Sequence, residues 1–318
     1  MKRFAHIICC LAALGAASCN DEVFVEDFLP QAPTVVLSES RSSAAVDFEA
    51  GNWDVAGVSD DFSRIIGRVY DLEGNDLGYD YGSKGLARIC FELDGLAFRI
   101  ERSAPDRLEL TLVENLRGEP VQLKVEVGNE FETEHIPLTL QPTSRYRIDS
   151  VEYGWEGFSS QDNMLELADR FTVDNSSGTE AVTIIVTPYR DAARTISFYS
   201  SDGHDESDFR RWFGEPLPGI TIPDIRDGKP VPDGPEVQFG IQQQRLDCGL
   251  DPEYSESVEI PAGLVREVHV YLETEEYSVP YSIHAVNPFN GREMTFSGEL
   301  RSSRPYGCLI IPLEPAEP

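Results

Sequence analysis

The chain has 318 residues, of which 41% are hydrophobic, and it carries 56 acidic against 26 basic side chains, for a formal net charge of −30. This charge argues against nucleic acids and anionic membrane surfaces as partners, because both repel an acidic protein. The length and the apolar content allow a sizeable core and indicate two domains rather than one.

Residues 1–18 have the layout of a signal peptide. Lys2 and Arg3 give a basic start, an apolar stretch runs from Phe4 to about Gly15, and small residues follow up to Ser18. The apolar stretch is too short to span a bilayer. We therefore predict that residues 1–18 are removed during export.

The small residues before Cys19 resemble the lipobox of bacterial lipoproteins, although Ala16 stands where that family usually has Leu. The resemblance implies that Cys19 is acylated, for example with palmitate, and becomes the N-terminus. Ordinary secretory cleavage near Ser18 is the alternative. Residues 19–32 are then a short acidic tether, which resembles the export signal of Bacteroidota surface lipoproteins. Together these features imply a lipid anchor in the cell outer membrane, at the cell surface, as the only membrane contact.

Apolar and polar side chains alternate with a period of two in most of the remaining chain. Residues 121–127 show this pattern, a Gly-Asn turn follows, and residues 135–140 form the next expected strand. The pattern recurs at residues 182–186, 195–199 and 265–272, and no long amphipathic helix stands out. It is typical of β-strands with one buried face. We predict an all-β protein with two tandem Ig-like β-sandwich domains, residues 33–142 and 143–318.

Four segments of the first domain carry a family resemblance. They are residues 46–55, which contain Trp53, residues 108–115, which end in Glu114-Asn115, residues 121–127 and residues 138–141. They resemble BACON-type domains, Ig-like β-sandwiches of Bacteroidota surface proteins. Residues 65–84 form a longer hairpin than that pattern leads one to expect. The resemblance implies a spacer or a carbohydrate-binding module, and no binding residue is carried over from it.

The second domain begins with an aromatic segment flanked by glycines, which contains Tyr153, Trp155 and Phe158. Glycines in turns expose aromatic rings, so these three residues are candidates for a glycan platform. Packing between the domains explains them equally well.

Residues 201–235 are expected to be a long loop insertion, because their six prolines cannot all lie in central strands. An acidic cluster at residues 202–208 offers oxygen ligands of the kind that Ca²⁺ takes, but its spacing fits no calcium loop. A solvated acidic loop is therefore favoured, and no cofactor or metal is predicted. The following residues are candidates for a contact surface, or for an anchor that holds the loop on the sandwich: Arg210, Arg211, Trp212 and Phe213.

Motifs for catalysis are absent from the sequence: there is no His-Glu-x-x-His, Gly-x-Ser-x-Gly, phosphate-loop or EF-hand pattern. Cys90, Cys248 and Cys308 follow Cys19, and a bridge between Cys248 and Cys308 stays open. We predict a non-enzymatic surface protein that serves as a glycan-binding or spacer module, with an extracellular glycan or a surface protein as partner. The alternative is a structural or accessory subunit of a fimbria-like assembly, in which trimming after Arg41 would release a strand.

Overall fold

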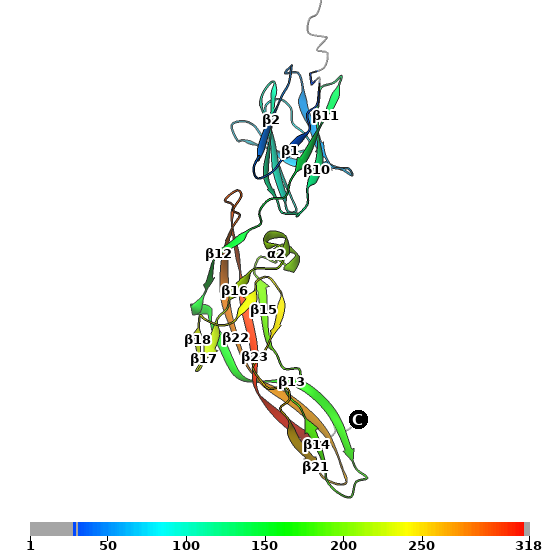
Figure 1. Ribbon diagram of the computed structural model, residues 1–318, viewed down its shortest axis with the longest axis vertical. Coiled ribbons are helices and arrows are strands. Elements are labelled where there is room, and N and C mark those ends of the chain that lie inside the picture. Colours follow the sequence, from blue (N-terminus) through cyan, green and yellow to red (C-terminus); the bar gives the residue numbers. More distant parts are fainter. Residues whose placement is uncertain (1–27, 30, 315–318) are drawn as a thin grey trace, which may run out of the picture. The chain divides into compact units, whose positions relative to one another are not determined.

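The computed structural model describes residues 28–29 and 31–314. It consists mainly of β-strands in several sheets, which confirms the all-β prediction. The chain divides into unit 1, which ends at Thr143, and unit 2, which begins at Ser144 (Figure 1). No helix of the described part is long and apolar enough to cross a membrane. The predicted signal peptide and Cys19 lie outside the described residues.

Unit 1 contains two sheets, with strand orders β1-β11-β10-β3-β4 and β2-β9-β8-β7-β5-β6. All neighbours are antiparallel except β1 and β11, which run parallel. The strands are β1 (Val35–Leu37), β2 (Ser43–Asp47), β3 (Asp54–Ser59), β4 (Arg64–Ile65), β5 (Gly67–Tyr70), β6 (Asp76–Asp80), β7 (Arg88–Leu93), β8 (Leu96–Ala104), β9 (Arg107–Asn115), β10 (Val121–Gly128) and β11 (Thr133–Leu140).

The core of unit 1 follows from the period of two, since alternate residues of its central strands are buried. Trp53 is buried, and its ring stacks on Phe48 with centroids 3.9 Å apart. The Arg102 guanidinium lies 4.3 Å from the Trp53 ring. Phe28 is buried as well and stacks with Phe48 at 6.2 Å. The packed part of unit 1 therefore reaches back into residues 19–32, which the sequence assigned to the tether.

Unit 2 contains a six-stranded sheet of order β12-β22-β23-β15-β20, in which β13 pairs along β22 as well. Three two-stranded sheets, β14-β21, β16-β19 and β17-β18, accompany it. The strands are β12 (Arg147–Tyr153), β13 (Ser159–Asn175), β14 (Val182–Val186), β15 (Arg194–Ser200), β16 (Gly219–Thr221), β17 (Asp224–Arg226), β18 (Lys229–Val231), β19 (Glu236–Gln238), β20 (Gln243–Leu246), β21 (Glu256–Ile260), β22 (Leu264–Val286) and β23 (Glu293–Leu313).

The long strand β22 buries opposite faces in its two halves. Its buried residues in the first half are Val268, Val270, Leu272 and Thr274, and those in the second half are Tyr277, Val279, Tyr281, Ile283 and Ala285. The register shifts along β22 place the extra residues in its partner strands, so β22 itself alternates without interruption. The even-numbered face is therefore buried in the first half, and the odd-numbered face is buried in the second half.

Different layers cover these two buried faces. The even face of the first half lies toward the β14-β21 sheet, since Cys308, which pairs with Leu272, places its Sγ 3.5 Å from a carboxylate oxygen of Glu256 in β21 (Figure 1). The odd face of the second half lies toward residues 201–246, since the Tyr277 hydroxyl donates to the Pro223 carbonyl at 2.5 Å. Between the two halves of β22 the covering layer moves from the even face to the odd face, and the even face becomes exposed at Glu276.

Residues 201–235 form more than a plain loop, because they contain the helix α2 (Glu206–Phe213) and three of the short strands. Asp205 caps the helix: its side chain accepts hydrogen bonds from the backbone N–H groups of Ser207 and Asp208. The acidic cluster at residues 202–208 thus begins a helix, and the described residues contain no group of three or more metal-binding side chains. Cys90, Cys248 and Cys308 are free thiols, so the two that were considered for a bridge are not joined.

Candidate functional site

The four candidate residues of α2 have partners inside unit 2. The Trp212 ring lies 5.1 Å from Phe296, and the Phe213 ring lies 5.5 Å from the same residue. Arg210 pairs with Glu206 and Glu215, both at 2.5 Å, and Arg211 pairs with Asp208 at 3.1 Å. This geometry fits the interpretation of the segment as an anchor, because its rings pack on the sheet and its charges are compensated locally.

Tyr153, Trp155 and Phe158 form a row around the 3-10 turn η1 (Trp155–Gly157). Neighbouring rings of this row are 6.2 Å apart, and the row ends at Tyr277, 5.6 Å from Phe158. The Tyr153 hydroxyl donates to the Thr221 carbonyl at 2.8 Å, and burial raises its pKa. Trp155 is 44% exposed, so within this row it is the ring most open to a ligand.

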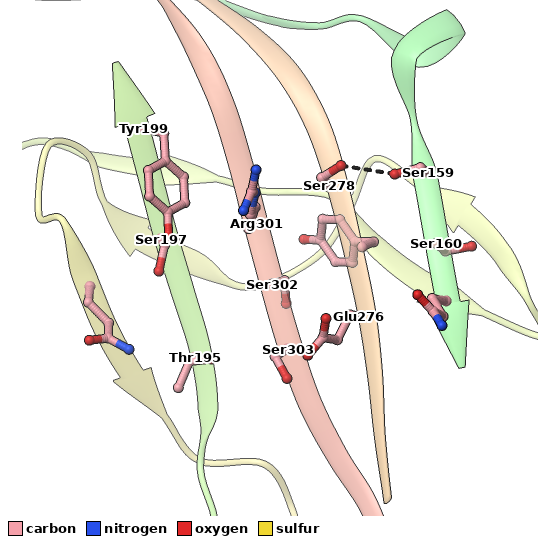
Figure 2. Close-up of a pocket in the computed structure, with 13 residues that line it drawn as sticks. Ser159, Ser160, Thr195, Ser197, Tyr199, Glu276, Ser278, Arg301, Ser302 and Ser303 are labelled. Atoms are coloured by element: carbon pink, nitrogen blue, oxygen red, sulfur yellow. Dashed lines mark hydrogen bonds between the residues drawn. The ribbon is translucent and has the colours of Figure 1, made fainter. Parts of the chain in front are cut away.

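A hollow on the exposed even face of the large sheet brings together polar residues that the sequence did not single out. Cross-strand partners share a face, so the register places two rows of side chains across five strands. One row is Gln243, Ser197, Arg301, Ser278 and Ser159, and the next is Arg245, Thr195, Ser303, Glu276 and Gln161. All of these residues except Arg245 line the hollow. Figure 2 shows the labelled members of both rows on neighbouring strands. We call this site the serine hollow, after Ser159, Ser197, Ser278 and Ser303 on its floor.

The serine hollow has a volume of about 510 Å³ and is open to solvent. Its floor is low because serine and threonine are small, whereas Tyr199, Arg301 and Gln243 rise beside it. The hydroxyls of Ser159 and Ser278 are hydrogen-bonded to each other at 2.9 Å. The floor therefore offers rows of hydroxyl groups, each of which can donate and accept.

One wall of the serine hollow combines an aromatic ring with a fixed charge. Tyr199 is 46% exposed, and the Arg301 guanidinium lies 4.9 Å from the centre of its ring. Arg301 also pairs with Glu299 at 2.5 Å, and this carboxylate raises its pKa. The pairing holds the guanidinium in place. A ligand in the serine hollow thus meets a ring, a guanidinium, the Glu276 carboxylate and several hydroxyls.

Sequence reasoning missed this site because its residues lie between positions 159 and 303 and form no motif. A signal does exist in β22, where the apolar alternation changes phase between Leu272 and Tyr277. That change marks a place where the sheet is covered first on one face and then on the other. The polar residues beside it are the ones left exposed.

No family model matches the chain, and no curated protein matches it. Among solved structures, it is similar to an aerolysin-like protein of Bombina maxima, at 12% identity over 51% of this chain and 95% of the other, with a TM-score of 0.25. Parasporin-2, a Bacillus thuringiensis toxin described as recognizing cancer cells, matches at 14% identity over 54% and 74%, with a TM-score of 0.25. A lamprey immune protein matches at 9% identity over 85% and 79%, with a TM-score of 0.30. At these TM-scores the similarity carries no argument about function.

Proposed function

We propose that the protein is a non-enzymatic, lipid-anchored protein of the bacterial surface that binds a neutral extracellular glycan in the serine hollow. The observation that carries this proposal is the pair of polar rows beside the exposed ring of Tyr199. Sugars present hydroxyls around their edges and C–H groups on their faces. Hydroxyl, amide and charged side chains next to an aromatic ring complement both kinds of surface.

Charge supports a neutral ligand over an acidic one. The serine hollow is lined by one carboxylate, Glu276, and one guanidinium, Arg301, which Glu299 compensates. The chain as a whole carries −30, so a sulfated or uronic-acid polymer would be repelled. Binding is favoured over hydrolysis because a glycosidase uses a pair of carboxylates, and Glu276 is the only one among the described residues that line the serine hollow.

Unit 1 fits the role of a spacer in this proposal, as an Ig-like, BACON-like sandwich. Its support is the arrangement of the strands in two sheets, with the matched residues Trp53 and Asn115 in its interior. The proposed anchor at Cys19 and the surface location depend on the lipobox and the acidic leader of the sequence. An acylated protein on the outer leaflet would present unit 2 to extracellular polymers.

The test is binding of the soluble chain, residues 20–318, to a panel of host and dietary polysaccharides. We expect saturable binding to a neutral polysaccharide and a loss of about tenfold in affinity for Tyr199→Ala, because the stacking ring is removed. Tyr81→Ala is the matched control, since Tyr81 is also 46% exposed but belongs to unit 1 and lies outside the serine hollow. Absence of binding across the panel, or equal losses in both variants, would refute the proposal.

A structural observation also favours the second candidate, a subunit of a fimbria-like assembly. Arg41 is exposed, and cleavage after it would release β1, a three-residue strand at the edge of its sheet that pairs with β11 alone. Val35 and Leu37 of β1 are buried, so its release would open an apolar edge of the sheet to a strand from another subunit. N-terminal mass analysis of the protein taken from cells separates the two: an acylated Cys19 supports the anchored binder, and an N-terminus at Ser42 supports the subunit.

A further inference from the structure

A second hollow adjoins the serine hollow on the same sheet. Its volume is about 840 Å³, and four residues line both hollows: Thr195, Gln243, Glu276 and Ser303. The second hollow continues along β22 to Leu272 and Val270 and is bordered by β13 and by the segment 187–193, which precedes β15. The two hollows are therefore parts of one long groove.

The long groove exists because a covering layer ends above the sheet. The even face of β22 is buried as far as Thr274, and it is exposed or half-buried from Glu276 onward. Residues 187–193 follow directly after β14, so they form the lip of that layer. One side of this channel is the regular strand β13, and the other is the turn at residues 187–193 that connects β14 to β15.

The chemistry changes along the long groove. Leu167 and Ile185, which are 48% and 65% exposed, give the second hollow accessible apolar side chains, whereas the serine hollow has a floor of hydroxyls. Charged groups line the second hollow as well: Glu166, Asp169, Asp191, Glu276, Arg190 and Arg245. Exposed apolar side chains next to polar and charged ones suit a sugar, which presents C–H groups on its faces and hydroxyls around its edges.

We propose that the ligand is an extended neutral oligosaccharide that occupies both hollows, so that the protein recognises several consecutive sugar units. This inference depends on the proposed function of the serine hollow. From Ser278 to Val270 the lining of the long groove follows β22 for eight residues, or roughly 27 Å at about 3.4 Å per residue. A site of that length is built for a polymer segment, because a single sugar would leave most of it filled with water.

The test measures affinity against chain length, with a size series of oligosaccharides from the neutral polysaccharide that binds best. We expect affinity to keep rising, by at least tenfold in total, beyond the shortest oligosaccharide that binds. Ala192→Trp places a bulky ring in the second hollow only. It is expected to abolish this rise and to leave the affinity for the shortest ligand unchanged.

Ala181→Trp is the matched control, because Ala181 is exposed and lines neither hollow. Arg190→Ala is a second probe of the second hollow that keeps the test decisive if Ala192→Trp does not fold, and it should reduce affinity for long ligands only. Two results would overturn the extended-ligand inference and leave the serine hollow as a binding site. One is an affinity that is the same for all oligosaccharide lengths that bind. The other is an undiminished rise of affinity with length in both Ala192→Trp and Arg190→Ala. Loss of binding at every length in Tyr199→Ala reports on the serine hollow separately. If the unmodified protein binds no member of the series, both proposals fail.

Discussion

Two tyrosines of β22 have similar burial but opposite surroundings at their hydroxyls, and this predicts opposite effects when each is replaced by phenylalanine. The Tyr281 hydroxyl is buried without a hydrogen-bond partner among the described residues, and its ring packs edge-on against Phe198 at 5.6 Å. The Tyr277 hydroxyl donates to the Pro223 carbonyl and lies 3.4 Å from a guanidinium nitrogen of Arg194.

The expected magnitudes follow from these contacts. Tyr281→Phe keeps the ring and removes an unsatisfied polar group, so the free energy of unfolding should rise by about 1 kcal/mol. Tyr277→Phe removes a satisfied hydroxyl and leaves a buried carbonyl without its donor, so the free energy of unfolding should fall by about 2 kcal/mol. Urea unfolding of the soluble chain and of each variant at pH 7 measures both changes.

The pH dependence of Tyr281→Phe gives an independent check. Burial, with a smaller contribution from the charge of Asp202, raises the pKa of Tyr281 to about 12. Folding therefore disfavours the phenolate, and the free energy of unfolding of the unmodified protein should fall as the pH rises from 10 toward 12. At pH 11 this loss is about 1.4 kcal/mol for a fully shielded group, and partial access of water reduces it to about 1 kcal/mol. The advantage of Tyr281→Phe should grow by that amount between pH 7 and pH 11.

A destabilised Tyr281→Phe at pH 7 would show that its hydroxyl has a partner, such as an ordered water, and would refute the reasoning. An advantage that stays constant up to pH 11 would show that the phenol ionises as freely in the folded protein as in the unfolded chain. Equal effects of the two substitutions would contradict the assignment of different environments to the two hydroxyls.

Three further predictions concern packing and buried polar groups, and urea unfolding measures each. Trp212→Ala should lower the free energy of unfolding of unit 2 by about 3 kcal/mol because its ring packs in an aromatic cluster, whereas Trp155→Ala should change it by less than about 1 kcal/mol. Asn115→Ala should cost unit 1 about 2–3 kcal/mol, because its buried amide donates to two backbone carbonyls; an unchanged midpoint would contradict this. Asp224→Asn should lower the free energy of unfolding of unit 2 by about 3 kcal/mol, because it leaves Arg194, whose side chain is 6% exposed, without its carboxylate. Replacing both residues by apolar ones should restore much of this loss.

The sequence contained enough information for the fold class. The strict period of two in residues 121–127 and 135–140 predicts β10 and β11, and both strands form with that burial pattern. Strand alternation is a local property, because each side chain only has to choose between two faces. The helix α2 was missed because it spans only eight residues, and its signal was a capping residue, Asp205, within a segment interpreted as an acidic loop.

The site was harder to predict because strand pairing is not local. Ser159 and Ser278 are 119 positions apart, yet their hydroxyls meet because β13 and β22 pair in that register. Aromatic residues drew attention in the sequence, but Trp212 and Phe213 lie in a packed cluster. Aromatic side chains gain most from burial, so a concentration of them marks a core as readily as a contact surface.

The change of buried face along β22 links the fold to the proposed binding site. A sheet covered on one face along its whole length buries one set of alternate residues, and its open face is free to be polar throughout. A sheet whose covering layer moves from one face to the other needs a polar residue on the face where the first layer ends. It needs an apolar residue on the opposite face, where the second layer begins. In β22 these residues are Glu276 and Tyr277. At this point the uncovered face of β22 lies next to residues 187–193, where the covering layer ends. The long groove is therefore a geometric consequence of the same alternation that builds the two cores. Inserting one residue between Thr274 and Tyr277 would turn the apolar residues of the second half of β22 to the opposite face of the sheet. These side chains would then point into the groove and close it.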